Sequence, residues 1–273
     1  MIVIVTDSTA PLTRQEAEQL GICMIPHSYT VDGTTYLETF TDENVGYADR
    51  LLRANKYATG QCTAAAFGAA FRQILAQGCE VLCLVISSRL SGAWTSAVTA
   101  ARETGNAHIA VIDSHATAGA LYYQLVRARG LIDSGLSLSR VADRCRQLEH
   151  VSGVTFSVEN MRALRRSHRL NFTTQSVNTI LNRRPVFMLE DGAIVTRGQA
   201  RGRAERIRMM TSLVPAGARR LMVQGFNNTP IENSLAHMVR REFPTIPVLQ
   251  RELGPVLSTH LGTDALAVSW CME

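Results

Sequence analysis

Two clusters of hydroxyl side chains, each directly before a helix-like segment, are the residues best placed to bind a ligand. Ser87, Ser88 and Ser91 follow an apolar run and precede Gly92, where a helical pattern begins. The second cluster, Thr-Gly-Gln-Cys-Thr at 59–63, precedes another helical stretch. Hydroxyl groups and free backbone N–H groups at the start of a helix can hold an anion. The pattern therefore predicts a site that binds a small anion through hydrogen bonds.

The sequence carries none of the common motifs for nucleophilic, nucleotide-binding or metal chemistry. The patterns G-x-S-x-G, G-x-x-x-x-G-K-[ST], G-x-G-x-x-G and H-E-x-x-H do not occur, and the seven histidines are dispersed. The six cysteines are scattered and lie mostly in apolar runs, which is typical of buried small side chains rather than of metal ligands. We therefore expect no metal site and no cofactor.

Ser91 admits three interpretations. It is the residue that would cap the helix beginning there, and a helix cap needs no ligand. It is also a candidate ligand for the carboxylate or phosphate of a small anion. A nucleophilic role would require a general base within hydrogen-bond reach, and the sequence reveals none. Hydroxyl clusters without a recognisable base favour binding over catalysis. Thr63, in the other cluster, is expected to be a simple helix cap.

The composition is that of an ordinary globular protein with a locally basic segment. The 273 residues are 46% hydrophobic, and the net charge is +5. Residues 159–208 carry eleven arginines and four acids, which leaves a net charge of −2 on the rest of the chain. A basic segment of this kind indicates a local anionic partner rather than general nucleic-acid binding. No apolar run approaches the roughly 20 residues that span a bilayer, and no signal peptide is evident, so we expect a cytoplasmic protein.

Alternating strand and helix patterns must position these hydroxyl clusters. An alternation of this kind predicts a parallel sheet covered by helices. A small hairpin is expected around Asp32-Gly33. In the N-terminal half, strands are expected at 2–6, 22–26, 81–87, 108–112 and 153–157, and helices at 13–20, 44–55, 64–77, 91–103, 117–134 and 138–149.

The C-terminal half is predicted to form a smaller α/β domain in which helices and a sheet pack as α+β layers. A turn at Asp191-Gly192 joins two of its strands. We place the domain boundary at 157, which gives a Rossmann-like domain at 1–157 and a second domain at 158–273. The expected helices are 159–167, 173–182, 202–214 and 230–242, and the strands are 185–190, 193–197, 220–225, 247–252 and 264–270.

With these segments the chain resembles the DegV family of bacterial fatty-acid-binding proteins. Residues 86–97 match the family element S-x-x-L-S-G-T-Y-x-S-A closely, and 111–114 match its V-I-D-S. Each motif alone is modest, but their order and spacing cover nearly the whole chain. The other matching segments are 5–10, 59–63, 181–185, 191–192, 201–203 and 254–260.

The resemblance implies a long-chain fatty acid buried in an apolar tunnel between the two domains. It implies that the carboxylate is held by Thr59 and Ser91, next to Gly92, with His260 nearby. From the sequence itself we expect His260 to lie in a loop between strands. For some members it also implies that the protein presents the acid to a fatty acid kinase for acyl-phosphate formation. We therefore expect a binding protein rather than an enzyme.

The basic segment contains the residues that we expect to contact such a partner. Arg169, Arg201 and Arg203 are either solvated surface residues or a docking patch for an acidic or phosphate-bearing protein. Asp7 and Ser8 end the first strand, where ligand crevices of α/β proteins form, although an aspartate there more often caps the next helix.

The chain departs from the family pattern at 165–170, where K-G-G-R-I is common, and at three further positions. Gly60 and Cys62 replace the usual serine and proline, which predicts a looser first loop. Asp264 would add a negative charge near the carboxylate unless it faces solvent.

Two rival functions follow from the residues themselves. One is a serine-dependent acyl hydrolase or transferase using Ser91, and the other is a nucleic-acid-binding regulator that uses the arginine segment. The sequence assigns no oligomeric state.

Overall fold

The computed structural model describes residues 1–159, 161–170 and 183–273, and its N-terminal half is built on a parallel sheet. The strands are β1 (Ile2–Asp7), β2 (Ile22–Ile25), β6 (Glu80–Val85) and β7 (Ile109–Asp113). They pair in the order β2–β1–β6–β7, and every pair is parallel. Continuous apolar runs form these strands because helices cover both faces of such a sheet.

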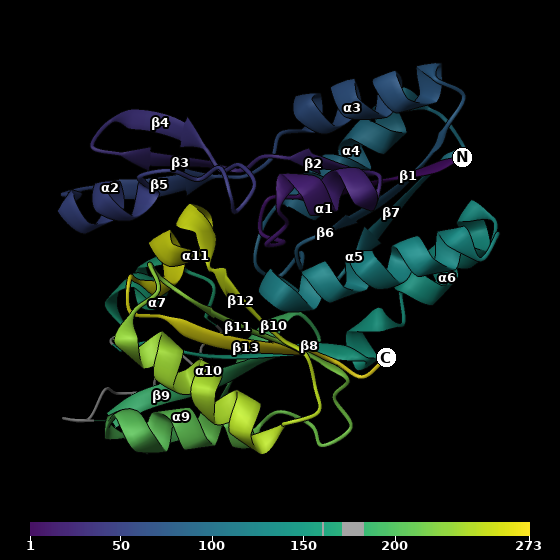
Figure 1. Cartoon of the computed structure of the whole chain (residues 1–273). Helices are drawn as coiled ribbons and strands as arrows, with labels where there is room; N and C mark the ends of the chain where they lie inside the picture. Colours follow the sequence, from purple (N-terminus) through teal and green to yellow (C-terminus); the bar gives the residue numbers. More distant parts are fainter. Residues whose placement is uncertain (160, 171–182) are drawn as a thin grey trace.

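Helices enclose this sheet on two sides. Apart from α2 (Tyr47–Arg53), which lies beside a small separate sheet, the helices of this half are α1 (Arg14–Gln19), α3 (Ala64–Ala76), α4 (Ala93–Thr104), α5 (Ala118–Asp133), α6 (Leu138–Cys145) and the short 3-10 helix η1 (Leu148–His150). Figure 1 shows α3 and α4 on one face and α5 and α6 on the other. The expected Rossmann-like α/β architecture is therefore confirmed.

A second, mixed sheet forms the other layer. Its strands are β8 (Ser152–Ser157), β9 (Arg183–Glu190), β10 (Ala193–Arg201), β11 (Arg220–Gly225), β12 (Val248–Glu252) and β13 (Leu266–Cys271). The order is β10–β9–β8–β13–β11–β12, antiparallel except for β11 with β12. In Figure 1 the helices α9 (Gly202–Ser212) and α10 (Pro230–Glu242) cover its outer face.

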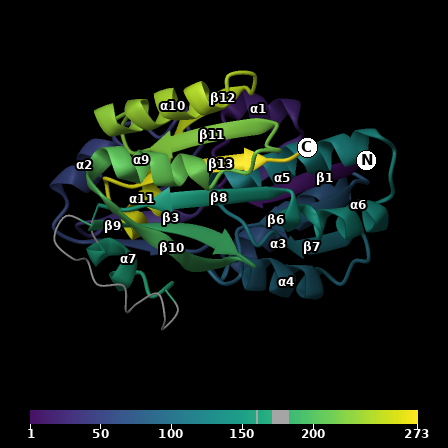
Figure 2. The same ribbon diagram turned by 90° about the horizontal axis from the view of Figure 1, so that it is seen from below.

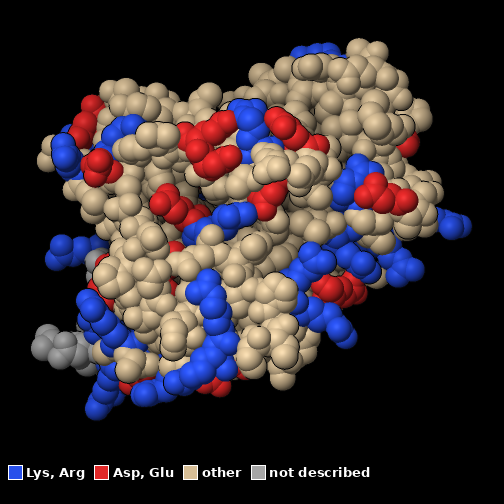
Figure 3. Space-filling view, in the orientation of Figure 1, with Lys and Arg blue, Asp and Glu red and all other residues tan. Residues whose placement is uncertain are grey.

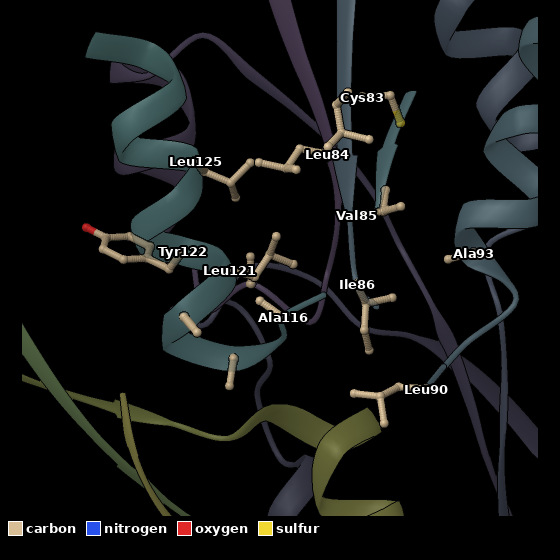
Figure 4. Close-up of a cluster of buried hydrophobic side chains, with 14 of the residues drawn as sticks. Cys83, Leu84, Val85, Ile86, Leu90, Ala93, Ala116, Leu121, Tyr122 and Leu125 are labelled. Atoms are coloured by element: carbon tan, nitrogen blue, oxygen red, sulfur yellow. The ribbon is translucent and has the colours of Figure 1, made fainter. Parts of the chain in front are cut away.

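Helix α5 lies between the two sheets. It packs against β1 on one side and against β8 and β13 on the other. All of its residues from Ala118 to Leu125 are buried, as expected of a helix that is covered all round. Figure 4 shows side chains of α5 and β6 pointing toward one another, with Ile86 and Leu90 just beyond the end of the strand.

Strand β8 connects the two layers. The expected domain boundary at 157 would assign this strand to the first domain. In the structure β8 hydrogen-bonds with β9 and β13 and lies within the second sheet. The division into 1–157 and 158–273 stays a prediction. The helix expected at 173–182 lies outside the described residues, and the helix expected at 159–167 is represented by α7 (Arg162–Arg166).

Two elements differ from the sequence expectations, and both shape the candidate site. Thr59 and Gly60, at the start of the second hydroxyl cluster, are not in a loop but end a strand, β5 (Tyr57–Gly60). It pairs with the expected hairpin, β3 (Ser28–Val31) and β4 (Thr34–Leu37), in a small antiparallel sheet beside α2 (Tyr47–Arg53). The segment around His260, expected to be a loop, is a helix, α11 (Gly254–Leu261).

The six cysteines are unpaired, and five are buried, as expected of small core side chains. Among the described residues, no helix is both long and apolar enough to cross a membrane.

Candidate functional site

An apolar cavity lies between the two layers of the protein. Ile86 and Leu90 line it from the first layer, Phe156 and Leu189 line it from the second, and Leu257 lines it from α11. Helix α11 forms another wall and packs against α2, β3, β5 and α7. Figure 2 shows α11 beside β3, on the side of the molecule that carries α2. A cavity with an apolar lining and a few polar groups is typical of a site for an amphipathic ligand.

Polar side chains gather at one part of this cavity. The His260 ring lies between Thr59 and Arg169, with Nε2 2.7 Å from Thr59 Oγ1 and Nδ1 3.1 Å from Arg169 Nη1. A guanidinium can only donate, so we assign the free lone pair of His260 to Nδ1 and its proton to Nε2. His260 then donates to Thr59 Oγ1, and the Thr59 hydroxyl proton is left to donate to a ligand.

Burial determines the charge state of the His260 side chain beside Arg169. The pKa of His260 is lowered to about 3, first by burial and then by the positive charge of Arg169. Its ring is therefore neutral at physiological pH. Arg169 donates to the carbonyl oxygens of Leu90 (2.6 Å) and Ser167 (2.8 Å). It forms no ion pair within the described part of the chain, so its positive charge is available to an anion in the cavity.

A second polar cluster surrounds Ser91, and one of its members, His27, was not expected from the sequence. His27 Nε2 lies 3.4 Å from Ser91 Oγ, while Nδ1 lies 3.3 Å from Cys62 Sγ and 3.7 Å from Asp7 Oδ1. Burial lowers the pKa of His27, so the ring is neutral near pH 7. Because Nδ1 faces the Asp7 carboxylate, we assign the proton to Nδ1 and the lone pair to Nε2. Ser91 can then donate either to His27 or to a ligand.

The strand order explains why these residues meet. Asp7, His27 and Ser91 lie at or just beyond the carboxyl ends of β1, β2 and β6, which are neighbours in the sheet. Ligand sites of parallel α/β sheets form at this edge. Asp7 is fully buried and accepts hydrogen bonds from Thr9 and from the Ile86 N–H rather than capping α1. His27 could have been predicted from the sequence because it follows an expected strand, and ligand sites form at the carboxyl ends of such strands.

A buried carboxyl group holds the start of α11. Glu38 is 1% exposed, and its oxygens accept from the Val256 N–H at 3.0 Å and from the Ser8 hydroxyl at 2.6 Å. The Val256 N–H belongs to the first turn of α11, where backbone N–H groups have no partner within the helix and need an acceptor. Ser8 Oγ in turn accepts from the His27 N–H at 3.0 Å. Glu38 therefore ties the helix that carries His260 to the segment that carries His27.

Glu38 should make stability depend on pH. Burial raises its pKa to about 8 from 4.5, so between these values the folded protein holds a proton that the unfolded chain has lost. Stability should fall as pH rises through this window, by up to about 1.4 kcal/mol per pH unit from this group. Glu38→Gln should remove that contribution, so urea unfolding should show a shallower decline from pH 5 to pH 8. Glu18→Gln, at an exposed position, is the control, and equal slopes in all three proteins would contradict the role of Glu38.

The structure brings together three of the expected ligand residues, Thr59, Ser91 and His260, along the cavity. Gly92 is the N-cap residue of α4, and a Cβ there would overlap the Gln61 side chain. Gln61, rather than Gly92, lines the cavity. Thr63 is a helix cap, as expected, and accepts from the Ala66 N–H.

The three arginines expected to contact a partner separate into two groups. Arg169 is half-buried and turned into the cavity, whereas Arg201 and Arg203 are exposed where β10 meets α9. Figure 3 shows Lys and Arg side chains gathered on the lower part of the face, over α9 and α10. Asp264 accepts from the Glu159 N–H at 3.2 Å and does not line the cavity. The docking role of these arginines stays a prediction.

Comparison with known proteins gives one consistent result. A family model described as "Uncharacterised protein, DegV family" matches residues 1–273. A DegV domain-containing protein of Halalkalibacterium halodurans is 26% identical, over 100% of this chain and 99% of that protein. A solved Thermus thermophilus structure, described as fatty acid binding of a DegV family protein, is 27% identical. It has a TM-score of 0.82 and covers 99% of both chains.

A further solved structure has the same fold at lower identity. It is the Streptococcus pneumoniae fatty acid kinase B3 protein loaded with linoleic acid. It shares 19% identity and a TM-score of 0.82, over 100% of both chains.

Proposed function

This chain belongs to the DegV family, and from that premise we propose that it binds a long-chain fatty acid in the cavity between its two layers. The observation that carries the proposal is the row of hydrogen bonds from Arg169 to His260 and from His260 to Thr59. It places a cation and a hydroxyl group at an apolar cavity. A carboxylate there can accept from Arg169, Thr59 and Ser91. An apolar tail of the ligand then gains about 0.8 kcal/mol for each buried methylene group.

We further propose that the protein presents the acid to a fatty acid kinase rather than acting on it. Support comes from the structural similarity to the kinase B3 protein of Streptococcus pneumoniae and from the exposed arginines, Arg201 and Arg203. Exposed guanidinium groups fit an acidic or phosphate-bearing partner because each can bind an oxyanion with two hydrogen bonds. The proposal involves no metal and no cofactor, and the chemistry belongs to the partner.

Denaturing extraction followed by lipid mass spectrometry tests fatty acid binding. The purified protein should release a fatty acid, and the stripped protein should take up added acids of 14–18 carbons. Ser91→Ala should weaken uptake by about tenfold or more, since it removes a hydrogen bond to a charged group. Ser88→Ala, which changes an exposed hydroxyl of the same cluster, should have no effect. The absence of both an extracted acid and uptake would reject the proposal.

A Ser91-dependent acyl hydrolase is the second candidate, and the position of His27 favours it. His27 Nε2 lies 3.4 Å from Ser91 Oγ, and the Asp7 carboxylate lies 3.7 Å from Nδ1 on the other side of the ring. With the proton assigned to Nδ1, this arrangement is that of a general base beside a serine. Such an enzyme would turn over long-chain acyl esters, and Ser91→Ala would abolish the turnover. A binding protein would retain the acid and release no alcohol from the ester. Salt-dependent DNA binding would instead support a nucleic-acid-binding regulator.

A further inference from the structure

The apolar cavity adjoins a second cleft of different chemistry. This cleft has a volume of about 360 Å³ and is lined by polar groups of His115, Gln124, Glu149, Ser152 and Glu190. Two residues, Val154 and Leu189, line both the cavity and the cleft. The polar residues Thr59, Ser91, Arg169 and His260 line only the cavity. The two spaces therefore meet at an apolar boundary that contains none of the residues proposed to hold the carboxylate.

The sheet places the two boundary residues side by side. Strands β8 and β9 are antiparallel, with Thr155 opposite Met188 and Phe156 opposite Phe187. Continued by one residue pair, this register sets Val154 opposite Leu189. Directly opposed residues project from the same face of a sheet with their Cβ atoms about 5 Å apart. Val154 and Leu189 therefore form one continuous apolar wall, and Val154 is only 3% exposed.

The cleft behind this wall is rich in hydrogen-bond acceptors. Gln124 is 1% exposed and donates through Nε2 to Ser114 O and Ser152 Oγ, while its Oε1 has no partner among the described residues. Glu149 contacts His115, and Glu190 pairs with Arg197. A buried acceptor without a donor is unfavourable by about 1–3 kcal/mol. The carboxylates of Glu149 and Glu190, which line the cleft, keep lone pairs that can accept from a hydroxyl. The cleft therefore suits a group that donates and disfavours both an alkyl chain and a second carboxylate.

We propose that Val154 and Leu189 set the longest acyl chain that the protein accepts, and that the cleft behind them selects for a hydroxyl at the chain end once this wall is opened. The inference rests on the proposed function. Each methylene that the cavity accommodates should raise affinity about fourfold, and the gain should stop where the chain meets the wall. Removing side-chain volume at the wall should admit the chain end into a polar space.

The experiment compares two series of acids with the full-length protein stripped of lipid. Saturated acids of 12–20 carbons and the matching ω-hydroxy acids compete with a fluorescent fatty acid for Val154→Ala, Leu189→Ala and wild type. In both variants the longest ω-hydroxy acids should bind about tenfold tighter than to wild type. The longest unmodified acids should gain less than threefold. Leu189 is only partly buried, so its replacement keeps the test valid where Val154→Ala folds poorly.

Val256→Ala is the matched control, because Val256 is also buried (4% exposed) and lines the cavity but not the cleft. It should give no preference for ω-hydroxy acids. An equal gain in Val256→Ala, or no gain in either wall variant, would overturn the inference while the wild type still binds fatty acids. If the wild type binds none of the acids, the proposed function fails and the inference falls with it.

Discussion

Replacing Arg206 by methionine should lower the free energy of unfolding by about 3–5 kcal/mol. Arg206 lies on α9 beneath the second sheet and is 1% exposed. Its guanidinium donates to Ser157 Oγ (2.9 Å), Ser157 O (2.8 Å) and Asp264 O (3.0 Å), and it pairs with Glu159 at 3.1 Å. Burial lowers its pKa to about 10, so it remains a cation at neutral pH. Methionine has similar length but leaves these buried acceptors without donors.

Urea unfolding of wild type, Arg206→Met and Arg208→Met measures this effect. Arg208 is exposed on the same helix, so its replacement should change the free energy of unfolding by less than about 0.5 kcal/mol. A loss below about 1 kcal/mol in Arg206→Met would show that the surrounding groups find water or other partners instead. Because Arg206 binds β8 to the segment before β13, its loss should destabilise the sheet that forms one wall of the cavity.

The parallel sheet could be predicted because its signals are local and strong. Each central strand is an apolar run, and burial on both faces requires no alternation of polar residues. The hairpin could be predicted from the Asp32-Gly33 pair, because these residue types tolerate the positive φ that a tight two-residue turn requires. Both residues do adopt positive φ in the structure. Helix α10 begins at Pro230 just after Thr229, a common helix start. Local sequence alone specifies such elements.

The predictions for β5 and α11 were wrong because the stability of both elements depends on partners far away in the sequence. Strand β5 is four residues long and pairs with β3, nearly thirty residues earlier in the chain. Nothing within so short a segment distinguishes it from a loop. Helix α11 did have a signal, because Pro255 stands at its start, where proline is favourable. Its serine and threonine residues are weak helix formers, so the segment was interpreted as a loop. Glu38, from another part of the chain, holds the start of this helix.

The candidate site was partly predictable for a related reason. Thr59 and Ser91 were predicted from hydroxyl clusters before helix-like segments, the resemblance to the DegV family added His260, and all three line one cavity. His27 was missed because a single histidine after a strand carries no motif. Arg169 was assigned to the surface because sequence shows a charge but not its direction. Only the fold turns this guanidinium inward, where its charge can act on a ligand.

Arg169→Met should weaken fatty acid binding by about 10- to 150-fold, the largest effect expected of any residue at the site. The guanidinium is the only cation among the described residues that line the cavity. Removing it leaves a ligand carboxylate with hydroxyl donors alone in an apolar surrounding. It also removes the donor to His260 Nδ1, so the histidine no longer keeps a single proton arrangement toward Thr59. Competition binding with a saturated acid of 16 carbons measures the loss.

The matching primary alcohol separates charge from shape. It fills the cavity with the same chain but carries no negative charge, so Arg169→Met should change its affinity by less than about threefold. Arg169→Lys should fall between wild type and Arg169→Met for the acid, because an ammonium keeps the charge and loses the two-pronged geometry. If Arg169→Met weakened acid and alcohol equally, the arginine would be shaping the cavity wall through Leu90 and Ser167 rather than pairing with a carboxylate. A selective loss for the acid would assign the charge of Arg169 to the ligand head group.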